Sequence, residues 1–419
     1  MRDKIVIVGG GFAGLSLARK LSGNKDHKVI LIDKANHHMF QPLFYQVASG
    51  RLEPSNISFP FRKIFQRSNN VQFRMTEVEK IIPSENRIIT EDGSFTYDKL
   101  VIATGCKTNF FGNEKMESLT YGMKTTQEAI SIRNHVLLTF EKLIIEKSRS
   151  DDGNWNIVIV GSGPTGVELA GAFAEMKKEV LPRDYPNMNF NDLRIILVSA
   201  TDKPLDVMST QAQNKSELYL KELGVEFWNN ERVVDYDGDK VFLESGKTIA
   251  SNNVIWAAGV SGNIVDGFDA DKIVRNRYIV DRYNRIKGFS NIFAIGDIAY
   301  METPKYPHGH PQVANVAINQ GVNVAKNFKK KNEKEWKEYE YQDLGSMATI
   351  GKHKAVVDLP KWKFQGRLAW YFWMFLHLML ILTVRNKIAI FFNWMLSYIN
   401  NDSSLRLIIL PNKKNRTEQ

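Results

Sequence analysis

Two copies of one glycine-rich motif constrain the fold of this chain more than any other feature. In the first copy, an apolar run at residues 4–8 predicts a buried strand, and Gly9, Gly11 and Gly14 follow with the spacing GxGxxG. Gly9 permits a tight turn, Gly11 lets the backbone approach a pyrophosphate, and Gly14 allows close packing of helix on strand. The helix N-terminus attracts phosphates. The next predicted strand ends at Asp33, which can hydrogen-bond ribose hydroxyls.

The motif recurs in the middle of the chain. A strand predicted at residues 156–160 is followed by Gly161, Gly163 and Gly166, and then by a helix. A lone GxGxxG is a weak signal, because glycine-rich turns occur in unrelated α/β proteins, but two complete units are much more specific. We therefore expect an α/β fold with two Rossmann-like dinucleotide-binding domains that hold two dinucleotides facing each other.

The nucleotide preference of the second unit depends on Ser199. The second strand of that unit ends there, at the position where an acidic residue would bind the ribose 2′-hydroxyl of NADH. Serine does not repel a 2′-phosphate, and Lys203 lies nearby in the sequence. We expect NADH as the nucleotide, with NADPH as an alternative.

Further strand ends carry small residues or an acid that suit a bound cofactor. Residues 103–105 read Ala-Thr-Gly, and residues 257–259 read Ala-Ala-Gly. Asp297 ends another strand, where it can accept hydrogen bonds from a ribityl chain or cap the next helix. The predicted cofactor-binding residues are Gly9, Gly11, Phe12, Ala13, Gly14, Asp33, Lys34, Gln46, Ala103, Thr104, Gly105, Gly161, Gly163, Pro164, Thr165, Gly166, Glu168, Ser199, Ala258, Gly259, Gly296 and Asp297.

Charge and cysteine count narrow the partners. The 419-residue chain carries a net charge of +10, which favours anionic partners without choosing among nucleotides, acidic lipid and nucleic acid. No Lys/Arg cluster with interleaved aromatics occurs outside the C-terminal region, so we do not expect nucleic acid. Cys106 is the only cysteine, which excludes an intramolecular disulfide and a multi-cysteine metal site, and we predict no metal. No signal peptide or presequence precedes the first strand, so we expect a cytosolic N-terminus.

The C-terminal region differs in character from the rest. Apolar, aromatic stretches at residues 368–384 and 388–399 are flanked by Lys and Arg. The first just misses the roughly twenty apolar residues that a spanning helix needs, and the second is clearly too short. A buried core helix and a spanning helix are alternatives. We favour two interfacial helices, with aromatics at the headgroup boundary and basic residues on anionic lipid.

The predicted domains follow from these patterns. If the first unit holds FAD and the second a nicotinamide, we expect an FAD-binding domain at residues 1–112 and 260–330, an NAD(P)H-binding domain at 113–259, and a C-terminal membrane-anchoring region at 331–419 with amphipathic helices at about 366–400. In this arrangement hydride passes from the nicotinamide to the flavin, and the protein positions the two rings. Glu168, in the first turn of the second unit's helix, is expected near the ring junction, where it can help place the nicotinamide or stabilise the helix dipole.

The electron acceptor is the remaining question. Disulfide reductases of the glutathione- and thioredoxin-reductase type need a cysteine pair, and sulfide:quinone oxidoreductases need more than one reactive cysteine, so Cys106 alone excludes both. The apolar, aromatic and basic C-terminal region points instead to an acceptor dissolved in the membrane, which means a quinone.

With these features the chain resembles the type II NADH dehydrogenases, the single-subunit NADH:quinone oxidoreductases. The resemblance covers nearly the whole length. It rests on residues 8–14, 40–43, 103–105, 161–168, 296–297 and 347–351, and on Trp373, His377, Arg385 and Trp394 in the C-terminal region.

The resemblance implies FAD bound with Asp33 and Asp297, a nicotinamide near Glu168, and two-electron reduction of a membrane quinone, menaquinone or ubiquinone, without proton pumping. It also implies a monotopic and often dimeric protein. We therefore expect a homodimer on an anionic lipid surface, at the cytoplasmic face of a bacterial inner membrane.

Two departures from the family pattern affect the site. The family usually has an acid where this chain has Ser199, and its quinone-site helix usually reads Ala-Gln-x-Ala-x-Gln, whereas residues 314–319 carry asparagine at both amide positions. Asparagine is one methylene shorter than glutamine, so direct contact with the quinone can pass to Gln320 or to a water. His377 is either a proton donor or a buried histidine between helices. We predict Glu168, Asn319 and Gln320 as catalytic residues, and Asn315, Asn319 and Gln320 as the quinone contacts.

Two other functions are alternatives. An NAD(P)H-dependent flavoprotein reductase of a soluble acceptor would stay in solution without detergent. A flavin redox sensor of the apoptosis-inducing-factor kind would turn over slowly with every acceptor.

Overall fold

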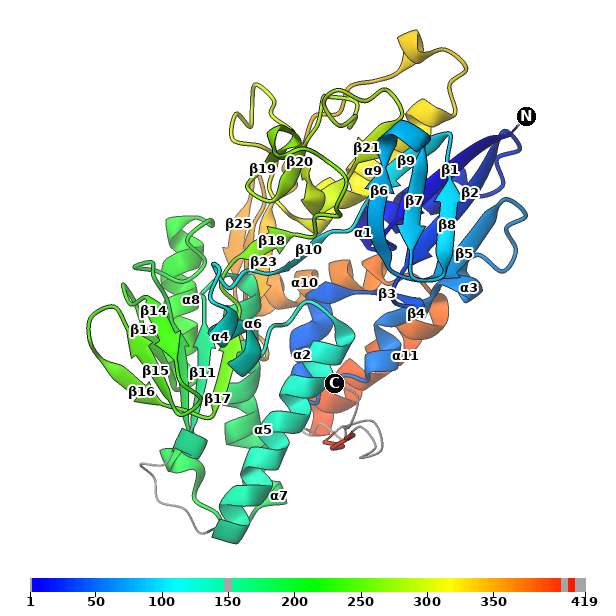
Figure 1. Ribbon diagram of the computed structural model, residues 1–419. Coiled ribbons are helices and arrows are strands. Elements are labelled where there is room, and N and C mark those ends of the chain that lie inside the picture. Colours follow the sequence, from blue (N-terminus) through cyan, green and yellow to red (C-terminus); the bar gives the residue numbers. More distant parts are fainter. Residues whose placement is uncertain (1, 147–152, 401–405, 411–419) are drawn as a thin grey trace. The chain divides into compact units, whose positions relative to one another are not determined.

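The computed structural model describes residues 2–146, 153–400 and 406–410, and it divides into two compact units (Figure 1). Unit 1 comprises Met1–Met39, Ser58–Lys107 and Val260–Gln342, and unit 2 comprises Phe40–Ile57, Thr108–Gly259 and Asp343–Gln419. In this division the C-terminal helices and the segment after Phe40 group with the second nucleotide-binding unit, and the three predicted domains stay a prediction.

A parallel five-stranded sheet with the order β21-β9-β1-β2-β5 forms the centre of unit 1. Its strands are almost continuously apolar because both faces are covered. The first helix packs along α9 and against β1 and β2, and a side sheet packs through Val6, Ile30, Ile81 and Ile88. The elements are β1 (Asp3–Val8), α1 (Phe12–Leu21), β2 (His27–Asp33), β5 (Val71–Met75), β6 (Val78–Ile82), β7 (Arg87–Thr90), β8 (Gly93–Thr96), β9 (Lys99–Ile102), β21 (Ile292–Ala294) and α9 (Ala314–Phe328).

Unit 2 repeats this design with a parallel four-stranded sheet of order β13-β12-β11-β17. Pro164 occupies the first turn of α6, where its fixed φ suits a helix start and its missing N–H costs nothing. The elements are α4 (Glu114–Leu119), α5 (Thr126–Glu146), β11 (Asn156–Val160), α6 (Pro164–Glu175), α7 (Leu181–Asp184), β12 (Arg194–Val198), α8 (Thr210–Glu222), β13 (Val225–Trp228), β14 (Val233–Tyr236), β15 (Lys240–Leu243), β16 (Thr248–Ala250) and β17 (Asn253–Trp256).

The aromatic stretch after Phe40 forms the short helix α2 (Phe44–Ala48), which packs against α5 and α6. Every residue of α2 is buried, which explains why its sequence shows no amphipathic period. Short elements complete the two units: β3 (His37–Met39), β4 (Ser58–Pro60), α3 (Phe61–Ile64), β10 (Cys106–Thr108), β18 (Val260–Gly262), β19 (Ile273–Val274), β20 (Arg277–Ile279) and β22 (Ala299–Tyr300).

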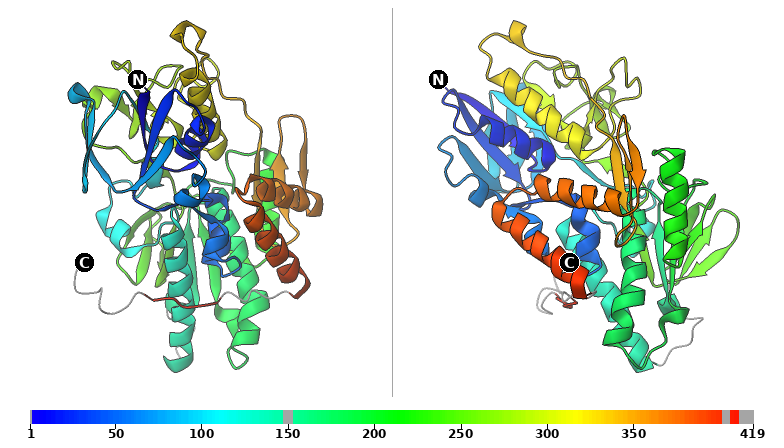
Figure 2. Two further views of the ribbon diagram at one scale, coloured as in Figure 1. Left: turned by 90° about the vertical axis from the view of Figure 1, so that its right-hand side faces the viewer. Right: turned by 180° about the vertical axis from the view of Figure 1, so that it is seen from behind.

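A small antiparallel sheet and two helices end the described chain. The sheet consists of β23 (Ser346–Thr349), β24 (Ala355–Asp358) and β25 (Lys363–Gln365). The helices α10 (Arg367–Leu380) and α11 (Val384–Asn400) follow, drawn in orange and red in Figure 2, which confirms the predicted pair of helices. In the parts of the chain that the structure describes, no helix combines the length and hydropathy needed to cross a bilayer.

The amphipathic pattern of α10 is clear from its burial. Ala369, Trp373 and His377 are buried at four-residue intervals, whereas Phe375 and Met379 lie among the exposed apolar side chains of the other face. The apolar residues exposed on the two helices are Leu368, Tyr371, Phe375, Met379, Leu380, Val384, Ile388, Phe391, Phe392, Met395 and Leu396, and we call them the apolar helix face.

Candidate functional site

The first glycine motif forms a tight turn between β1 and α1. Gly9 has φ +100°, and a Cβ there would lie 2.3 Å from the carbonyl oxygen of Ala103. A Cβ at Gly14 would lie 2.0 Å from the carbonyl oxygen of Gly9. A Cβ at Gly11 would meet nothing within 4 Å. Packing therefore requires two of the three glycines, whereas the third leaves open space for a ligand.

A cavity opens within unit 1 at the carboxyl ends of β1 and β2, and its empty space of about 1150 Å³ includes a part that is open to solvent. Asp33 lines it, and its carboxylate accepts the main-chain N–H groups of Gly10 at 2.6 Å and Ala35 at 2.8 Å. Burial raises the pKa of Asp33, and these two hydrogen bonds oppose the shift. The lining residues are Val8, Gly9, Ile32, Asp33, Lys34, Thr76, Glu77, Val78, Thr104, Lys107, Ser261, Gly262, Asn263, Ile264, Val265 and Asn276.

The lining of this cavity fits a dinucleotide. The buried hydroxyl of Thr76 has no hydrogen-bond partner among the described residues, and it lies one residue beyond the end of β5. Lys34, which contacts Glu77 at 3.3 Å, and Lys107 supply positive charge, while Thr104 donates to the carbonyl oxygen of Asn263 at 2.7 Å. Thr76 is not among the residues predicted from the sequence, although the end of the third parallel strand is a usual place for a ligand contact.

Gln320 is fully buried on α9, and it holds the turn after β21. The main-chain N–H of Gly296 donates to Gln320 Oε1 at 2.7 Å, and Gly296 itself has φ +78°. The neighbouring Asp297 accepts the thiol of Cys106 at 3.1 Å, and Gln312 donates to its carbonyl oxygen at 3.0 Å. A Cβ at Gly296 would lie 3.0 Å from that of Ala13, so α1, this turn and α9 pack closely.

The other predicted quinone residues lie on a different face of α9. Asn319 is exposed, and its amide donates to Asn315 Oδ1 at 2.8 Å. The structure thus brings Asn315 and Asn319 together and directs Gln320 to Gly296. These three residues belong to unit 1, whereas Glu168 belongs to unit 2. Phe12, at the start of α1, contacts His38 edge to face at 5.1 Å.

The second glycine motif repeats the geometry of the first. A Cβ at Gly161, which has φ +105°, would lie 2.8 Å from main-chain atoms of Ala258. A Cβ at Gly166 would lie 1.9 Å from the carbonyl oxygen of Gly161. A Cβ at Gly163 would meet nothing within 4 Å. Thr165 follows Pro164 in the first turn of α6, where main-chain N–H groups are free for an anion. Gly259, with φ +79°, completes the turn after β17.

Ser199 lies in a cluster of hydroxyl groups at the end of β12. Its Oγ is 2.6 Å from Ser162 Oγ and 2.9 Å from Thr201 Oγ1. Lys203 pairs with Glu217 at 2.5 Å, so its charge is already matched. The position that often carries an acid is therefore neutral and buried in this chain.

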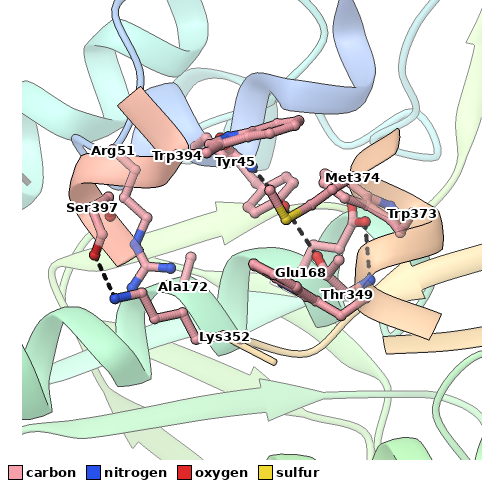
Figure 3. Close-up of a pocket in the computed structure, with 13 residues that line it drawn as sticks. Tyr45, Arg51, Glu168, Ala172, Thr349, Lys352, Trp373, Met374, Trp394 and Ser397 are labelled. Carbon is pink, nitrogen blue, oxygen red and sulfur yellow. Dashed lines mark hydrogen bonds between the residues drawn. The ribbon is translucent and has the colours of Figure 1, made fainter. Parts of the chain in front are cut away.

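A second cavity lies wholly within unit 2, and its empty space of about 560 Å³ includes a part that is open to solvent (Figure 3). It is formed by α2, α6, the β23–β24 hairpin, α10 and α11. Figure 3 shows aromatic side chains at one end and Arg51, Lys352 and Ser397 at the other. The lining residues are Tyr45, Gln46, Arg51, Glu168, Ala172, Thr349, Gly351, Lys352, Trp370, Trp373, Met374, Trp394 and Ser397.

Glu168 is the acid of this cavity. Its Oε1 accepts the main-chain N–H of Thr349 at 3.4 Å, and a side-chain hydrogen bond also joins the two residues. Burial raises the pKa of Glu168 to about 8, against the lowering effect of these hydrogen bonds. The carboxyl group is therefore mostly protonated at neutral pH and can donate a proton.

The two ends of the cavity differ in chemistry. Trp373 stacks on His377 at 4.0 Å, and burial lowers the pKa of His377 to about 4, so this histidine is neutral and donates Nδ1–H to the carbonyl oxygen of Trp373 at 2.9 Å. At the other end Arg51 pairs with the buried Glu175, and Lys352 donates to the carbonyl oxygen of Ser397 at 2.6 Å. The aromatic end suits a flat apolar ring. At the other end, the charged groups of Arg51 and Lys352 already have partners within the protein.

Most residues of this cavity are not among those predicted from the sequence. Gln46 is predicted as a cofactor-binding residue, and the structure places it here, bonded to Tyr45 and Trp394. The stretch after Phe40 and the Met-Ala-Thr-Ile-Gly run at 347–351 carry the family resemblance, but neither pattern assigns a role to Tyr45 or Thr349. The signal available was the aromatic, non-periodic composition around Tyr45.

Comparisons with known proteins agree over almost the whole chain. Residues 3–321 match the pyridine nucleotide-disulphide oxidoreductase family, and residues 344–401 match the NDH2 C-terminal domain. The chain is 33% identical to the type II NADH:quinone oxidoreductase NdhA of Mycobacterium tuberculosis over 95% of this chain and 87% of that protein. It is 29% identical to the type II NADH:quinone oxidoreductase of Staphylococcus aureus over 85% and 89% of the two chains.

Solved structures share the fold. NDH2 from Plasmodium falciparum, solved in complex with NADH, is 21% identical and covers 98% of this chain and all of its own, with a TM-score of 0.88. The sulfide:quinone oxidoreductase of Aquifex aeolicus is 22% identical over 98% and 96% of the two chains, with a TM-score of 0.73.

Proposed function

The chain belongs to the type II NADH:quinone oxidoreductase family, and from this premise we propose how its residues divide the reaction. The enzyme oxidises NADH with a flavin and passes two electrons to a quinone, without pumping protons. The reaction is divided among the two nucleotide-binding units, the aromatic cavity of unit 2 and the apolar helix face.

Unit 1 is the FAD site in this proposal. FAD, when bound, supplies the acceptance of a hydride from NADH and the return of two electrons to the quinone. The open side of Gly11 and the N-terminus of α1 receive the pyrophosphate, and Asp33 and the unpartnered Thr76 hydroxyl receive ribose or adenine groups. Asp297, fixed by Cys106 and by the Gly296 turn, contacts the ribityl chain.

Unit 2 is the NADH site. The open side of Gly163 and the first turn of α6 receive its pyrophosphate in the same way. Ser199 and its hydroxyl neighbours receive the ribose and carry no charge that would reject a 2′-phosphate. NADH is the proposed physiological donor, and this neutral position is the reason that NADPH is retained as a weaker one.

The observation that carries the quinone part is the buried carboxyl group of Glu168 in the aromatic cavity of unit 2. Reduction of a quinone to a quinol consumes two electrons and two protons. NADH supplies the two electrons and one proton as hydride, so one more proton must come from the protein or from solvent. Glu168 is a buried carboxyl group with a pKa of about 8, and it faces a cavity lined by Tyr45, Trp373 and Trp394. We assign Glu168 as the donor of that proton, and the aromatic rings as the walls that hold the quinone ring.

The membrane partner is assigned to the apolar helix face of α10 and α11. Phe375 is 63% exposed and Phe391 48% exposed, and Arg367 and Arg385 at the helix starts are exposed cations. An interfacial helix with this pattern binds anionic lipid while lying in the headgroup plane. We propose peripheral attachment through this face, at the cytoplasmic side of a bacterial inner membrane, with a homodimer as the assembled form.

Narrowing the cavity tests the quinone assignment. Met374 lines the cavity at its α10 wall and is only partly buried, so Met374→Trp can be accommodated while it reduces the free space. We expect the quinone KM to rise at least about tenfold, with the rate of flavin reduction by NADH unchanged. Met379→Trp, on the exposed face of the same helix, is the matched control. An unchanged quinone KM in Met374→Trp would place the quinone elsewhere.

A further inference from the structure

A chain of hydrogen bonds joins α11 to the acid of the aromatic cavity. Trp394 Nε1 donates to Gln46 Oε1 at 2.8 Å, and Gln46 Nε2 donates to the phenolic oxygen of Tyr45 at 3.0 Å. The Tyr45 hydroxyl lies 3.0 Å from Thr349 Oγ1, and Thr349 bonds Glu168 through its N–H group and its side chain. The five residues come from four segments of unit 2, because Tyr45 and Gln46 are neighbours on α2, and all five line one cavity. Figure 3 labels Tyr45, Glu168, Thr349 and Trp394 in this cavity.

The donor-to-acceptor direction of these hydrogen bonds is fixed by Trp394 on α11. An indole N–H can only donate, so the carbonyl oxygen of Gln46 faces Trp394 and its NH₂ group faces Tyr45. The phenolic oxygen then accepts from Gln46 and has its own proton free for Thr349. With that bond in place, the Thr349 hydroxyl has its proton free for Glu168. Successive donors pointing one way polarise each other, which strengthens the last bond of the series.

We propose that Trp394, Gln46, Tyr45 and Thr349 are positioning residues that orient the Glu168 carboxyl group and govern its release of a proton to the quinone. The inference rests on the proposed function, in which Glu168 is the proton donor. It adds that the placement of α11 is linked to the quinone step through a continuous series of hydrogen bonds.

The hydroxyl groups of Tyr45 and Thr349 allow this series of hydrogen bonds to stabilise Glu168 both with and without its proton. While Glu168 holds its proton, its carbonyl oxygen can accept the Thr349 hydroxyl, and its own O–H is left for the quinone. When the O–H bond of Glu168 breaks and a new O–H bond forms on the quinone oxygen, Thr349 still donates to the resulting carboxylate, and Tyr45 still donates to Thr349. NADH supplies the two electrons and one proton that the quinone needs, and Glu168 supplies the second proton, so the reduction to quinol balances. The new carboxylate gains charge-assisted hydrogen bonds, which offset part of the cost of burying it.

The hydrogen-bond series starts on a helix with two different faces. Trp394 points from α11 into the cavity (Figure 3). Phe391 and Met395 on the same helix belong to the exposed apolar helix face. A shift of α11 that moves Trp394 away from Gln46 leaves a carboxamide oxygen without its donor. Gln46 is then free to turn, and the direction of the whole series is lost. Contact with lipid on the outer face can therefore favour the arrangement that readies Glu168.

Substitution of Thr349 tests the series at its acid end. Thr349→Val keeps the N–H group and removes the hydroxyl that donates to the carboxylate, so the apparent pKa of the quinone half-reaction should rise by about one unit. Thr349→Ser should restore the wild-type pH profile. Tyr45→Phe should shift the profile in the same direction by less, because it removes only the donor to Thr349. The rate of flavin reduction by NADH should be unchanged in all three.

Substitution of Trp394 tests the link to α11. Trp394→Phe keeps a ring and removes the N–H donor, and it should shift the pH profile upward, whereas Trp362→Phe, at a 72% exposed indole outside the cavity, should not. If the wild-type enzyme reduces quinone and the pH profiles of Thr349→Val, Tyr45→Phe and Trp394→Phe all superimpose on its profile, the positioning role is overturned. The proposed function would then still stand. A wild-type enzyme that does not pass electrons to quinone would overturn the proposed function, and the inference with it.

Discussion

The main-chain N–H of Gly296 donates to the side-chain oxygen of Gln320 at 2.7 Å, and Gln320 is completely buried. This bond fixes the turn that presents Asp297, so we expect Gln320→Leu to leave an unsatisfied N–H and to weaken FAD retention about tenfold or more. Titration of released flavin against protein measures this effect. Asn319→Leu, on the exposed face of the same helix, should retain the flavin and tests the predicted quinone contact through its quinone KM. Equal flavin affinity in Gln320→Leu and wild type would refute the role of Gln320 in the turn.

The glycines of the first motif should separate folding from cofactor binding. We expect Gly9→Ala to destabilise the protein by roughly 3 kcal/mol or more, because its Cβ would overlap the carbonyl group of Ala103 and its φ is +100°. Gly11→Ala should leave the Tm of the flavin-free protein unchanged and should lower FAD affinity, because its Cβ enters only the open space. Thermal unfolding and flavin titration of both variants check this. A large loss of Tm in flavin-free Gly11→Ala would contradict the division.

The residue at the end of β12 should set nucleotide selectivity. Ser199→Glu adds an acid that can accept ribose hydroxyls and repels a 2′-phosphate, so the ratio of kcat/KM for NADH over NADPH should rise about tenfold or more. Ser199→Ala keeps the position neutral and should leave that ratio near the wild-type value. An unchanged ratio in Ser199→Glu would mean that the ribose is recognised elsewhere.

Quinone reduction should depend on pH through Glu168. Because burial raises its pKa to about 8, the carboxyl group is protonated below that pH, and the quinone half-reaction should slow as the pH rises through about 8. Glu168→Gln should lack this step and should lower the rate about 100-fold or more, with flavin reduction by NADH retained. The two half-reactions are measured separately by flavin absorbance. If Glu168→Gln slowed the NADH step instead, the residue would place the nicotinamide, which is the role that its position in the sequence suggests.

The apolar helix face should carry membrane binding. The double substitution Phe375→Glu and Phe391→Glu replaces exposed apolar rings with acids and should reduce binding to anionic vesicles severalfold. Met75→Glu, a change at a 56% exposed apolar residue of unit 1, is the control. Binding is followed by co-sedimentation with vesicles of phosphatidylglycerol and phosphatidylcholine at two salt concentrations. Unaltered sedimentation of the double variant would exclude this face as the attachment site.

Local patterns made the nucleotide-binding units predictable. The requirement for glycine at Gly9 and Gly161 arises within a few residues of each turn, so spacing alone reveals it. On α9, the buried residues Val316, Gln320 and Val324 recur at four-residue intervals. The same spacing places Gln320 with the apolar stripe rather than with Asn319, and a glutamine on such a stripe must find a buried partner. The quinone contact was predicted from the helix pattern of the resembled family, and the spacing within α9 could not identify the partner, because Gly296 lies in a distant segment.

The aromatic cavity could not be predicted in this way. Tyr45, Glu168, Thr349, Trp373 and Trp394 lie in segments separated by up to about 350 residues of chain. The residue spacing within one segment does not predict which other segments it will meet. The cavity arises only when α2, α6, β23, α10 and α11 pack together. The raised pKa of Glu168 is equally non-local, since it comes from burial by these elements.

The most direct test of Glu168-assisted quinone reduction is anaerobic stopped-flow spectroscopy of the detergent-purified full-length enzyme, with flavin absorbance as the signal. NADH is added first, and menaquinone and ubiquinone analogues are then mixed with the reduced enzyme at several pH values. We predict fast bleaching by NADH, followed by fast recovery with quinone that slows as the pH rises through about 8. Bleaching without quinone-driven recovery would contradict this reaction and would direct the search to soluble acceptors.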